Sequence, residues 1–273
     1  MTLAVSCNLS DGVVLGVDSA FTVSMGGTTK VYDSADKLFA LGTKPIGVAM
    51  YGAGEFGGRV IGNYMAEFEA KHPEVARADA ELAVVAETLR AFFHERYMTI
   101  VAPALEKSKG KPFADIPETE RPGLGLVIAG FSPGQYLSEV WNVLIPNHIN
   151  VGSAIRVAGQ GEFNSNWFAL YEPIFRYWWG YDPRVVEDVA NYIGTIRAPL
   201  TDPEKVGFVN AFGQRQYLFP VGMMPMPVAV EFVKFLVGLV ISHHRFEIAA
   251  SGVGGLARVG IATYRGGPFK IVS

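Results

Sequence analysis

The stretch Thr2-Leu-Ala-Val-Ser-Cys-Asn-Leu-Ser-Asp-Gly-Val-Val-Leu-Gly-Val-Asp18 decides the fold of this 273-residue chain. Its first half alternates apolar with small or polar side chains, which is typical of a β-strand with one buried face. Ser10-Asp11-Gly12 predicts a turn, because glycine tolerates positive φ and aspartate can bond its own backbone. Val13 to Val17 then return as the second strand of a hairpin. The hairpin brings Asp18 beside Thr2, since facing Cβ atoms lie roughly 5 Å apart.

Thr2 is a candidate nucleophile that would carry its own base. Its small side chain permits removal of Met1, which would leave a threonine at the N-terminus. A threonine hydroxyl is a weak nucleophile and needs an adjacent base. A free α-amino group, with a pKa near ~8, is largely available for that role.

Three motifs resemble successive motifs of the proteasome β-type subunits. More widely, they resemble the bacterial proteasome-like group of N-terminal-nucleophile (Ntn) hydrolases. The motifs are Asp11–Ser19 (DGVVLGVDS), Asp36–Phe39 (DKLF) and Gly47–Gly52 (GVAMYG). The family pattern is an N-terminal Thr, then D-G-V-V-L-A-x-D, then a Lys before a short apolar strand, then an A-G turn. The resemblance covers about the first hundred residues and resumes in about the last fifty.

This resemblance implies a role for each of four residues. Thr2 would be the nucleophile, with Asp18 and Lys37 as its charge partners. Gly52 would be the backbone donor to the oxyanion. A nearby lysine ammonium lowers the pKa of an amine and of a hydroxyl, and a backbone donor to an oxyanion is worth about 3 kcal/mol. The alternative is that Thr2 only starts a strand and that Lys37 is a solvated edge residue.

The residues expected to support the site depart from the family pattern. Val157-Ala-Gly-Gln-Gly-Glu162 stands where the family has a Gly-Ser-Gly-Ser loop, so Glu162 would replace the serine that assists the N-terminal amine. The family also usually places an Asp and a Ser just before a Gly-Gly pair near the C-terminus. Here Ala250 and Val253 occupy those positions, and Ser251 is the nearby substitute.

Composition narrows the function classes. The net charge of −3, with no long basic run, argues against nucleic-acid binding. Cys7 is the single cysteine, which excludes an internal disulfide framework and a cysteine-rich metal site, and we expect it to be buried and inert. The sequence has no phosphate-binding glycine loop of the Walker or dinucleotide kind, and we expect no cofactor. With a single cysteine we also expect no metal. We read His243-His244 as helix C-terminal residues. With no signal-peptide pattern, the expected location is the cytoplasm.

The order of the remaining elements fits a four-layer αββα sandwich, an α+β fold of two stacked, mainly antiparallel sheets flanked by helices. We expect one Ntn-hydrolase-like domain over residues 1–273. The predicted strands span 37–41, 46–50, 123–130, 136–144, 257–263 and 268–272, and the predicted helices span 55–71, 78–97, 183–197 and 228–242.

Two stretches stand out from this plan. Residues from about 163 to 224 form an aromatic-rich helical insertion, which either covers its own subunit or contacts a partner, because Trp and Tyr are enriched at interface anchors. Residues 228–242 are strongly apolar, but Glu231 and Lys234 interrupt them and a membrane span needs about 20 apolar residues. We therefore expect a buried layer helix and no membrane.

The resulting hypothesis is a proteasome-like threonine-type hydrolase that cleaves peptide or amide bonds through an acyl-enzyme. We expect it to form a homo-oligomer, and a ring is one arrangement that this oligomer could take. Two alternatives stay open. One is a catalytically silent ring subunit, which retention of Met1 would support. The other is a small-molecule Ntn amidase, which a narrow cleft closed by the insertion would support. The sequence says nothing about an ATPase partner.

Overall fold

The chain divides into two compact units. The computed structural model describes residues 2–25, 28–77, 80–146, 153–182, 184–196, 200–214, 217–247, 252–265 and 267–273. Unit 1 comprises Met1–Ala169 and Val221–Ser273, and unit 2 comprises Leu170–Pro220. Unit 2 falls within the aromatic-rich stretch, 163–224, that departs from the family pattern.

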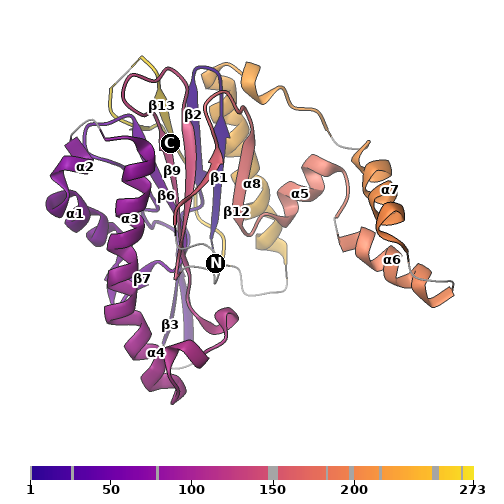
Figure 1. Cartoon of the computed structure of the whole chain (residues 1–273), viewed down its shortest axis with the longest axis horizontal. Coiled ribbons are helices and arrows are strands. Elements are labelled where there is room, and N and C mark those ends of the chain that lie inside the picture. Colours follow the sequence, from indigo (N-terminus) through magenta and orange to yellow (C-terminus); the bar gives the residue numbers. More distant parts are fainter. Residues whose placement is uncertain are drawn as a thin grey trace. The chain divides into compact units, whose positions relative to one another are not determined.

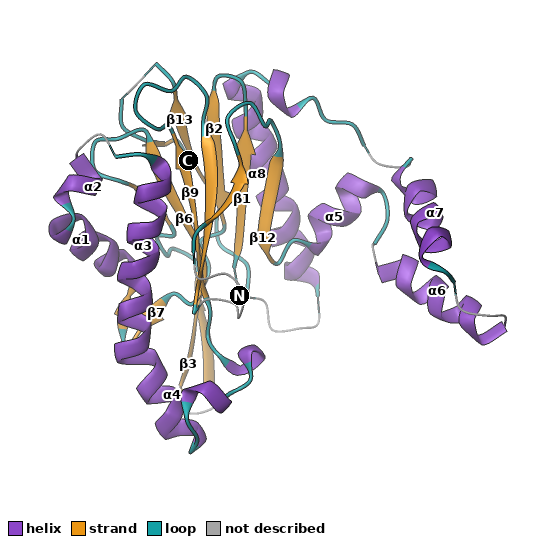
Figure 2. Cartoon of the chain, in the orientation of Figure 1, coloured by secondary structure: helices purple, strands orange, loops and turns teal. Residues whose placement is uncertain are grey.

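Two five-stranded antiparallel sheets form the centre of unit 1 (Figure 2). The first sheet has the order β12 (Ser165–Ala169), β1 (Leu3–Asn8), β2 (Gly12–Val17), β13 (Arg258–Thr263), β14 (Lys270–Ile271). The second has the order β11 (Ile155–Ala158), β10 (Glu139–Ile145), β9 (Leu124–Gly130), β6 (Ile46–Gly52), β5 (Leu38–Ala40). Two small hairpins pair β3 (Phe21–Met25) with β4 (Thr28–Tyr32), and β7 (Glu55–Phe56) with β8 (Arg59–Val60).

Helices cover the outer faces of both sheets. The second sheet is covered by α1 (Ile61–Lys71) and α3 (Leu82–Arg96), with α2 (Pro73–Arg77) between them. A π-helical turn, Tyr97–Val101, leads from α3 into α4 (Ala102–Lys109). On the opposite side, α8 (Met226–Phe246) packs on β1, β2 and β13 of the first sheet (Figure 1). The expected four-layer αββα sandwich is therefore confirmed.

Strand β6 illustrates how the alternation of side chains builds two cores. Val48 and Met50 belong to the cluster between the second sheet and its helices. Ala49 and Tyr51 point to the opposite face and belong to the cluster between the two sheets. Because both of its faces are covered, β6 lies in a central layer of the sandwich. The sequence of an inner strand of this kind is a nearly continuous apolar run.

The prediction that β1 buries only one face is wrong. Every residue of β1 is buried. Ala4 packs between the sheets, while Val5 is paired with Gly16, where an added Cβ would collide with Val233 of α8. Alternation alone could not reveal the second layer, because α8 comes from the far end of the chain.

Two predicted element boundaries are also wrong. The helix expected from residue 55 begins at Ile61, because the β7–β8 hairpin occupies residues 55–60. The helical insertion expected from residue 163 begins with a strand instead. β12 pairs with β1 along its length, from Leu3 opposite Ala169 to Cys7 opposite Ser165. This pairing makes β12 the outer strand of the first sheet.

Helix α8 is a layer helix with one buried face. By length and apolar composition alone it could cross a membrane. In the structure, Ala229, Val233, Leu236, Val237 and Val240 are buried. Glu231 and Lys234 form an ion pair of 3.0 Å on exposed turns. The expectation of a buried layer helix is confirmed for that one face only, since Phe235 is 45% exposed.

Unit 2 consists mainly of three helices, α5 (Glu172–Trp179), α6 (Arg184–Ile196) and α7 (Asp202–Gly213). The helix predicted over 183–197 corresponds to α6, which contacts α7. Within the described residues α6 buries none of its side chains, whereas α5 buries Pro173, Ile174 and Trp178.

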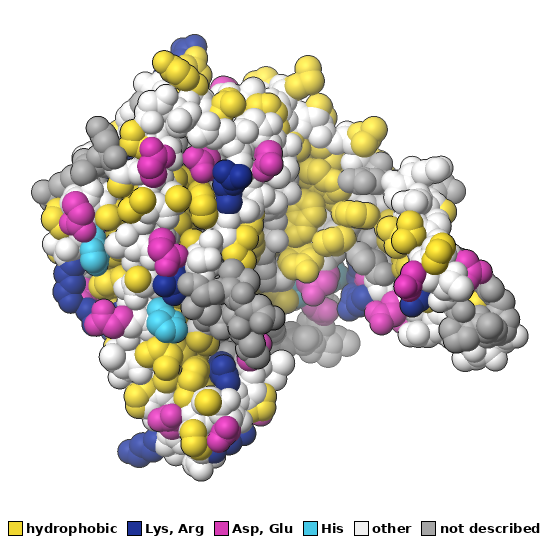
Figure 3. Space-filling model, in the orientation of Figure 1, with side chains coloured by type: hydrophobic (Ala, Val, Ile, Leu, Met, Phe, Trp, Pro, Cys, Tyr) yellow, Lys and Arg dark blue, Asp and Glu magenta, His cyan; other side chains and the backbone are white. Residues whose placement is uncertain are grey.

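Charged side chains of both signs share the surface. On the described part of the face drawn in Figure 3, Lys and Arg side chains lie among Asp and Glu. This mixture agrees with the small net charge of −3. The described residues on that face therefore form no basic stripe of the kind that marks a nucleic-acid site.

Candidate active site

The β1–β2 hairpin sets the first part of the site. Its register pairs Ala4 with Val17, so Leu3 stands opposite Asp18. The backbone N–H of Leu3 donates to Asp18 Oδ1 at 3.0 Å. Thr2 directly precedes Leu3 in the chain, and Thr2 is only 3% exposed. The predicted proximity of Thr2 and Asp18 is therefore present.

Lys37 joins this pair from another element. Its Nζ donates to Asp18 Oδ1 at 3.0 Å and Oδ2 at 3.1 Å, and to Thr2 Oγ1 at 3.4 Å. All three residues are buried. The carbonyl of Lys37 accepts a bond of 2.8 Å from the N–H of Met50, which ties the start of β5 to β6. Burial lowers the pKa of the Lys37 ammonium, and the charge and hydrogen bonds of Asp18 oppose this shift.

Asp18 has three backbone donors besides the Lys37 side chain. It accepts backbone bonds from Leu3, from Ala20 at 3.1 Å and from Gly254 at 3.2 Å. A carboxylate with this many donors is fixed in one orientation. Asp18 therefore orients Lys37 while Lys37 reaches the Thr2 hydroxyl.

Ser19 is a structural partner of the site that the sequence analysis missed. Its Oγ donates to the carbonyl of Asp33 at 2.6 Å and accepts from the N–H of Leu256 at 2.8 Å. Its backbone N–H donates to Gly254 O at 3.2 Å. Ser19 thus holds the loop that supplies a donor to Asp18. The one feature of the sequence that could have indicated this role is the position of Ser19, directly after Asp18 at the end of an apolar strand.

Gly52 ends β6 with φ +86°, and a Cβ here would lie 2.2 Å from the carbonyl oxygen of Gly123. Only glycine fits this left-handed position. The N–H of Met50 faces β5, because it donates to Lys37 O. Strand alternation turns the Gly52 N–H to the same side, the side of Lys37. This direction is the one an oxyanion donor would need.

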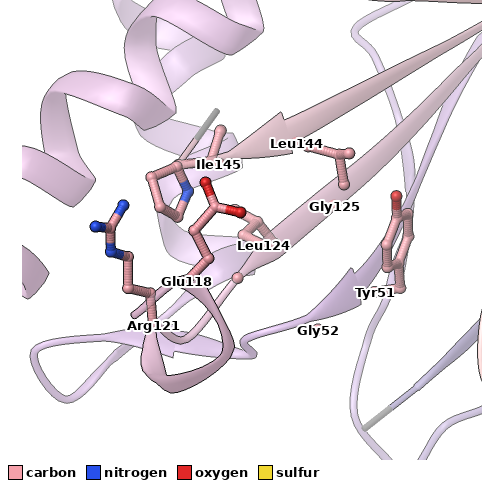
Figure 4. A pocket seen from close by; sticks show the side chains of 10 residues that line it. Tyr51, Gly52, Glu118, Arg121, Leu124, Gly125, Leu144 and Ile145 are labelled. Atoms are coloured by element: carbon pink, nitrogen blue, oxygen red, sulfur yellow. The ribbon is translucent and has the colours of Figure 1, made fainter. Parts of the chain in front are cut away.

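Two cavities lie along this end of the second sheet. One, of about 230 Å³, is lined by Gly52 and Tyr51, and in Figure 4 the Glu118 side chain lies beside Leu124 and Ile145 on its other side. The second, of about 550 Å³, is lined by Lys37 together with Phe21, Phe39, Met50 and Gly54. The larger cavity offers a recess beside Lys37 with apolar and polar walls, since Ser34, Asp36 and Asn63 also line it.

Glu162 and Ser251 were both expected to support the site. The prediction that Glu162 assists the amine of Thr2 is wrong. The carbonyl of Glu162 accepts a bond of 2.8 Å from Asn8 Nδ2, and its carboxylate accepts one of 2.6 Å from the N–H of Gly159. At about 3.3 Å per residue, Asn8 lies roughly 20 Å along β1 from Thr2. Glu162 therefore closes its own turn at the far end of the strand. Ser251 lies outside the described residues, as do Met1 and Ala250.

Cys7 is buried, and burial raises the pKa of its thiol to about 12. A thiol held in this form is a poor nucleophile, because the thiolate is the reactive species. The expectation that Cys7 is buried is confirmed. Thr2 is therefore the candidate nucleophile, since its hydroxyl lies beside Lys37.

Comparison with solved structures identifies the class of fold. The structure is similar to a Gly-1 mutant of Anbu from Hyphomicrobium sp. strain MC1, with a TM-score of 0.53 and 11% identity over 100% of this chain and 85% of that one. It also aligns with Anbu, described as an ancestral beta-subunit, from Yersinia bercovieri, with a TM-score of 0.48 and 12% identity over 96% of this chain and 81% of that one. No family model matches the chain, and no curated protein matches it in sequence. The fold is therefore of the proteasome-like Ntn-hydrolase type.

Proposed function

We propose that this protein is a threonine-type Ntn hydrolase that cleaves peptide or amide bonds through an acyl-enzyme at Thr2. The observation that carries the proposal is the buried contact of Lys37 Nζ with both Thr2 Oγ1 and Asp18. The similarity to Anbu supports the fold in which this cluster lies. A buried lysine held by a carboxylate next to a hydroxyl is an arrangement suited to activating that hydroxyl.

In the proposed reaction, the Oγ1 of Thr2 attacks the carbonyl carbon of the amide. Its proton passes to the α-amine of Thr2, which must be free of Met1. The Lys37 ammonium stabilises the negative charge that develops on Oγ1, and the N–H of Gly52 donates to the oxyanion. The protonated amine then gives its proton to the leaving nitrogen, and the C–N bond breaks. Water, deprotonated by the same amine, hydrolyses the ester and restores Thr2.

The cavity of about 550 Å³ beside Lys37 is the proposed site for a substrate side chain. Phe21, Phe39 and Met50 form an apolar wall of this cavity, so we expect the apolar part of the substrate side chain to contact them. Ser34, Asp36 and Asn63 also line the cavity and leave room for a polar group on that side chain. A small-molecule amidase with the same chemistry is the second candidate for the substrate class. The buried Cys7 thiol fits a reducing compartment, and we propose the cytoplasm.

The first test concerns the N-terminus. We expect purified protein to begin at Thr2, and a hydroxyl-directed electrophile such as a β-lactone to add one equivalent of mass. Intact-mass analysis followed by peptide mapping measures both. The label should map to Thr2 and to none of the other threonines. Full retention of Met1 would contradict the catalytic proposal and favour a silent subunit, because an acylated nitrogen cannot act as the base.

The second test concerns assembly, which is part of the proposal for a proteasome-like subunit. We expect a homo-oligomer whose mass persists on dilution through the micromolar range. Light scattering coupled to size exclusion, across a dilution series, measures this directly. A stable monomer would contradict the chambered arrangement and favour a free-standing amidase with the same Thr2 chemistry.

A further inference from the structure

An aromatic corner lies at the C-terminal end of α5 in unit 2. The rings of Phe175 and Trp179, one helical turn apart, stack with centroids 5.4 Å apart and an interplanar angle of 20°. Gly180 ends the helix in the left-handed conformation, with φ +74°, and the chain turns back. Tyr181 therefore meets Trp179 edge to face, with centroids 6.0 Å apart and an angle of 82°. Trp179 and Tyr181 form two walls at nearly a right angle.

This corner is one side of a cavity of about 540 Å³ that lies entirely within unit 2. The other sides are formed by α6, which contributes Val186, Ala190 and Glu187, and by α7, which contributes Lys205. A volume of this size is within the range of small-molecule sites, which are mostly apolar with a few placed polar groups. The cavity is separate in sequence from the Thr2 cluster, and none of its lining residues belongs to that cluster.

The charges at the cavity favour a cation. Among the described residues, Glu187 has no hydrogen-bond or ion-pair partner. The Lys205 ammonium lies 4.0 Å from Asp202 Oδ1 on the same helix, so a carboxylate already offsets its charge. The carboxylate of Asp182, which follows Tyr181 in the chain, forms ion pairs with Arg176 and Arg184. Glu187, an exposed residue, is thus the carboxylate that lines the cavity, and Lys205 is the cation on its opposite side that already has a carboxylate neighbour.

We infer that this cavity of unit 2 binds a small organic cation of the quaternary ammonium class. The face of Tyr181 and the face of Trp179 that is not stacked on Phe175 attract a cation through their quadrupoles, and such contacts strengthen when the cation is desolvated. A quaternary ammonium presents apolar methyl groups to Val186 and Ala190 and a positive charge to Glu187. An anion would be repelled by Glu187, and a neutral molecule of the same shape would gain nothing from that carboxylate.

The test is calorimetric titration of the full-length protein with choline and, in parallel, with 3,3-dimethylbutan-1-ol. The alcohol has the same shape as choline but carries no charge. Choline should bind at least about tenfold more tightly than the alcohol, because only choline gains the cation–π and carboxylate attraction. Equal affinities would overturn the inference and leave a merely apolar cavity. Failure of choline to bind at about 10 mM would also overturn it.

A matched pair of variants on α6 locates the site. Glu187→Gln keeps the shape of the side chain and removes its charge, so it should weaken choline binding about tenfold and leave the alcohol unchanged. Asp188→Asn removes a neighbouring charge that does not line the cavity, and it should leave choline binding within about twofold. Equal losses in the two variants would overturn the assignment, because general electrostatic attraction would then explain the binding. Thr2 labelling should be the same in both variants, which keeps this inference independent of the proposed hydrolase activity.

Discussion

Lys37→Ala is expected to lower turnover, or the rate of electrophile labelling at Thr2, by roughly 10³-fold. The Lys37 ammonium is the positive group in contact with Thr2 Oγ1, at 3.4 Å. Without it, the pKa of the hydroxyl and of the Thr2 amine both rise, and the developing alkoxide loses its partner. The rate constant for labelling, followed by intact mass over time, measures the effect.

The fold should survive this substitution, because Asp18 keeps three backbone donors, from Leu3, Ala20 and Gly254. A cooperative unfolding transition in Lys37→Ala would confirm that survival. Lys107→Ala, an exposed lysine at the end of α4, is the matched control and should label at the wild-type rate. Unchanged labelling of Lys37→Ala would mean that the lysine has only a structural role.

Asp18→Ala is expected to lower the free energy of unfolding by about 3–5 kcal/mol, because it leaves a buried ammonium without its partner. The same change removes the acceptor for the N–H groups of Leu3, Ala20 and Gly254. Chemical denaturation of the variant and the wild type at neutral pH measures the difference. Asp115→Ala, at an exposed position, is the control and should change stability by less than about 0.5 kcal/mol.

The stability deficit of Asp18→Ala should also depend on pH in a defined direction. Burial already lowers the pKa of Lys37 from 10.5, and Asp18 opposes that shift. Without Asp18 the folded-state pKa falls further. Between that lowered value and 10.5 the unfolded chain binds more protons than the folded one, so stability rises with pH in this window. The deficit should therefore shrink as the pH approaches 10.5. A deficit independent of pH would show that the lost backbone bonds, and not the unpaired ammonium, account for it.

The local part of the site was predictable from sequence. A turn at Asp11-Gly12 between two alternating apolar runs determines the register, and the register determines that Asp18 faces the start of β1. Lys37 could be placed only through the family motif, because no local pattern reports a contact across 19 residues. Both inferences depend on short segments whose geometry is controlled by the backbone.

The parts that could not be predicted depend on packing between distant segments. Glu162 was placed near Thr2 by matching a glycine-containing loop, but the pairing of β12 with β1 carries that loop to the Asn8 end. The role of Ser19 depends on the loop at Gly254, more than two hundred residues later. Hydrophobic periodicity contains no information about which distant loop a buried hydroxyl will meet.

The bond from Gly254 to Asp18 has a consequence for the timing of synthesis. These two residues are 236 positions apart in the chain. Synthesis proceeds from the N-terminus at roughly 5–20 residues per second, so Thr2 leaves the ribosome long before Gly254 is made. A nascent chain thus holds the proposed nucleophile but lacks one of the donors that fix Asp18. The set of donors to Asp18 is completed only when the last part of the chain has folded, so we expect the proposed activity to be absent from a protein still being translated.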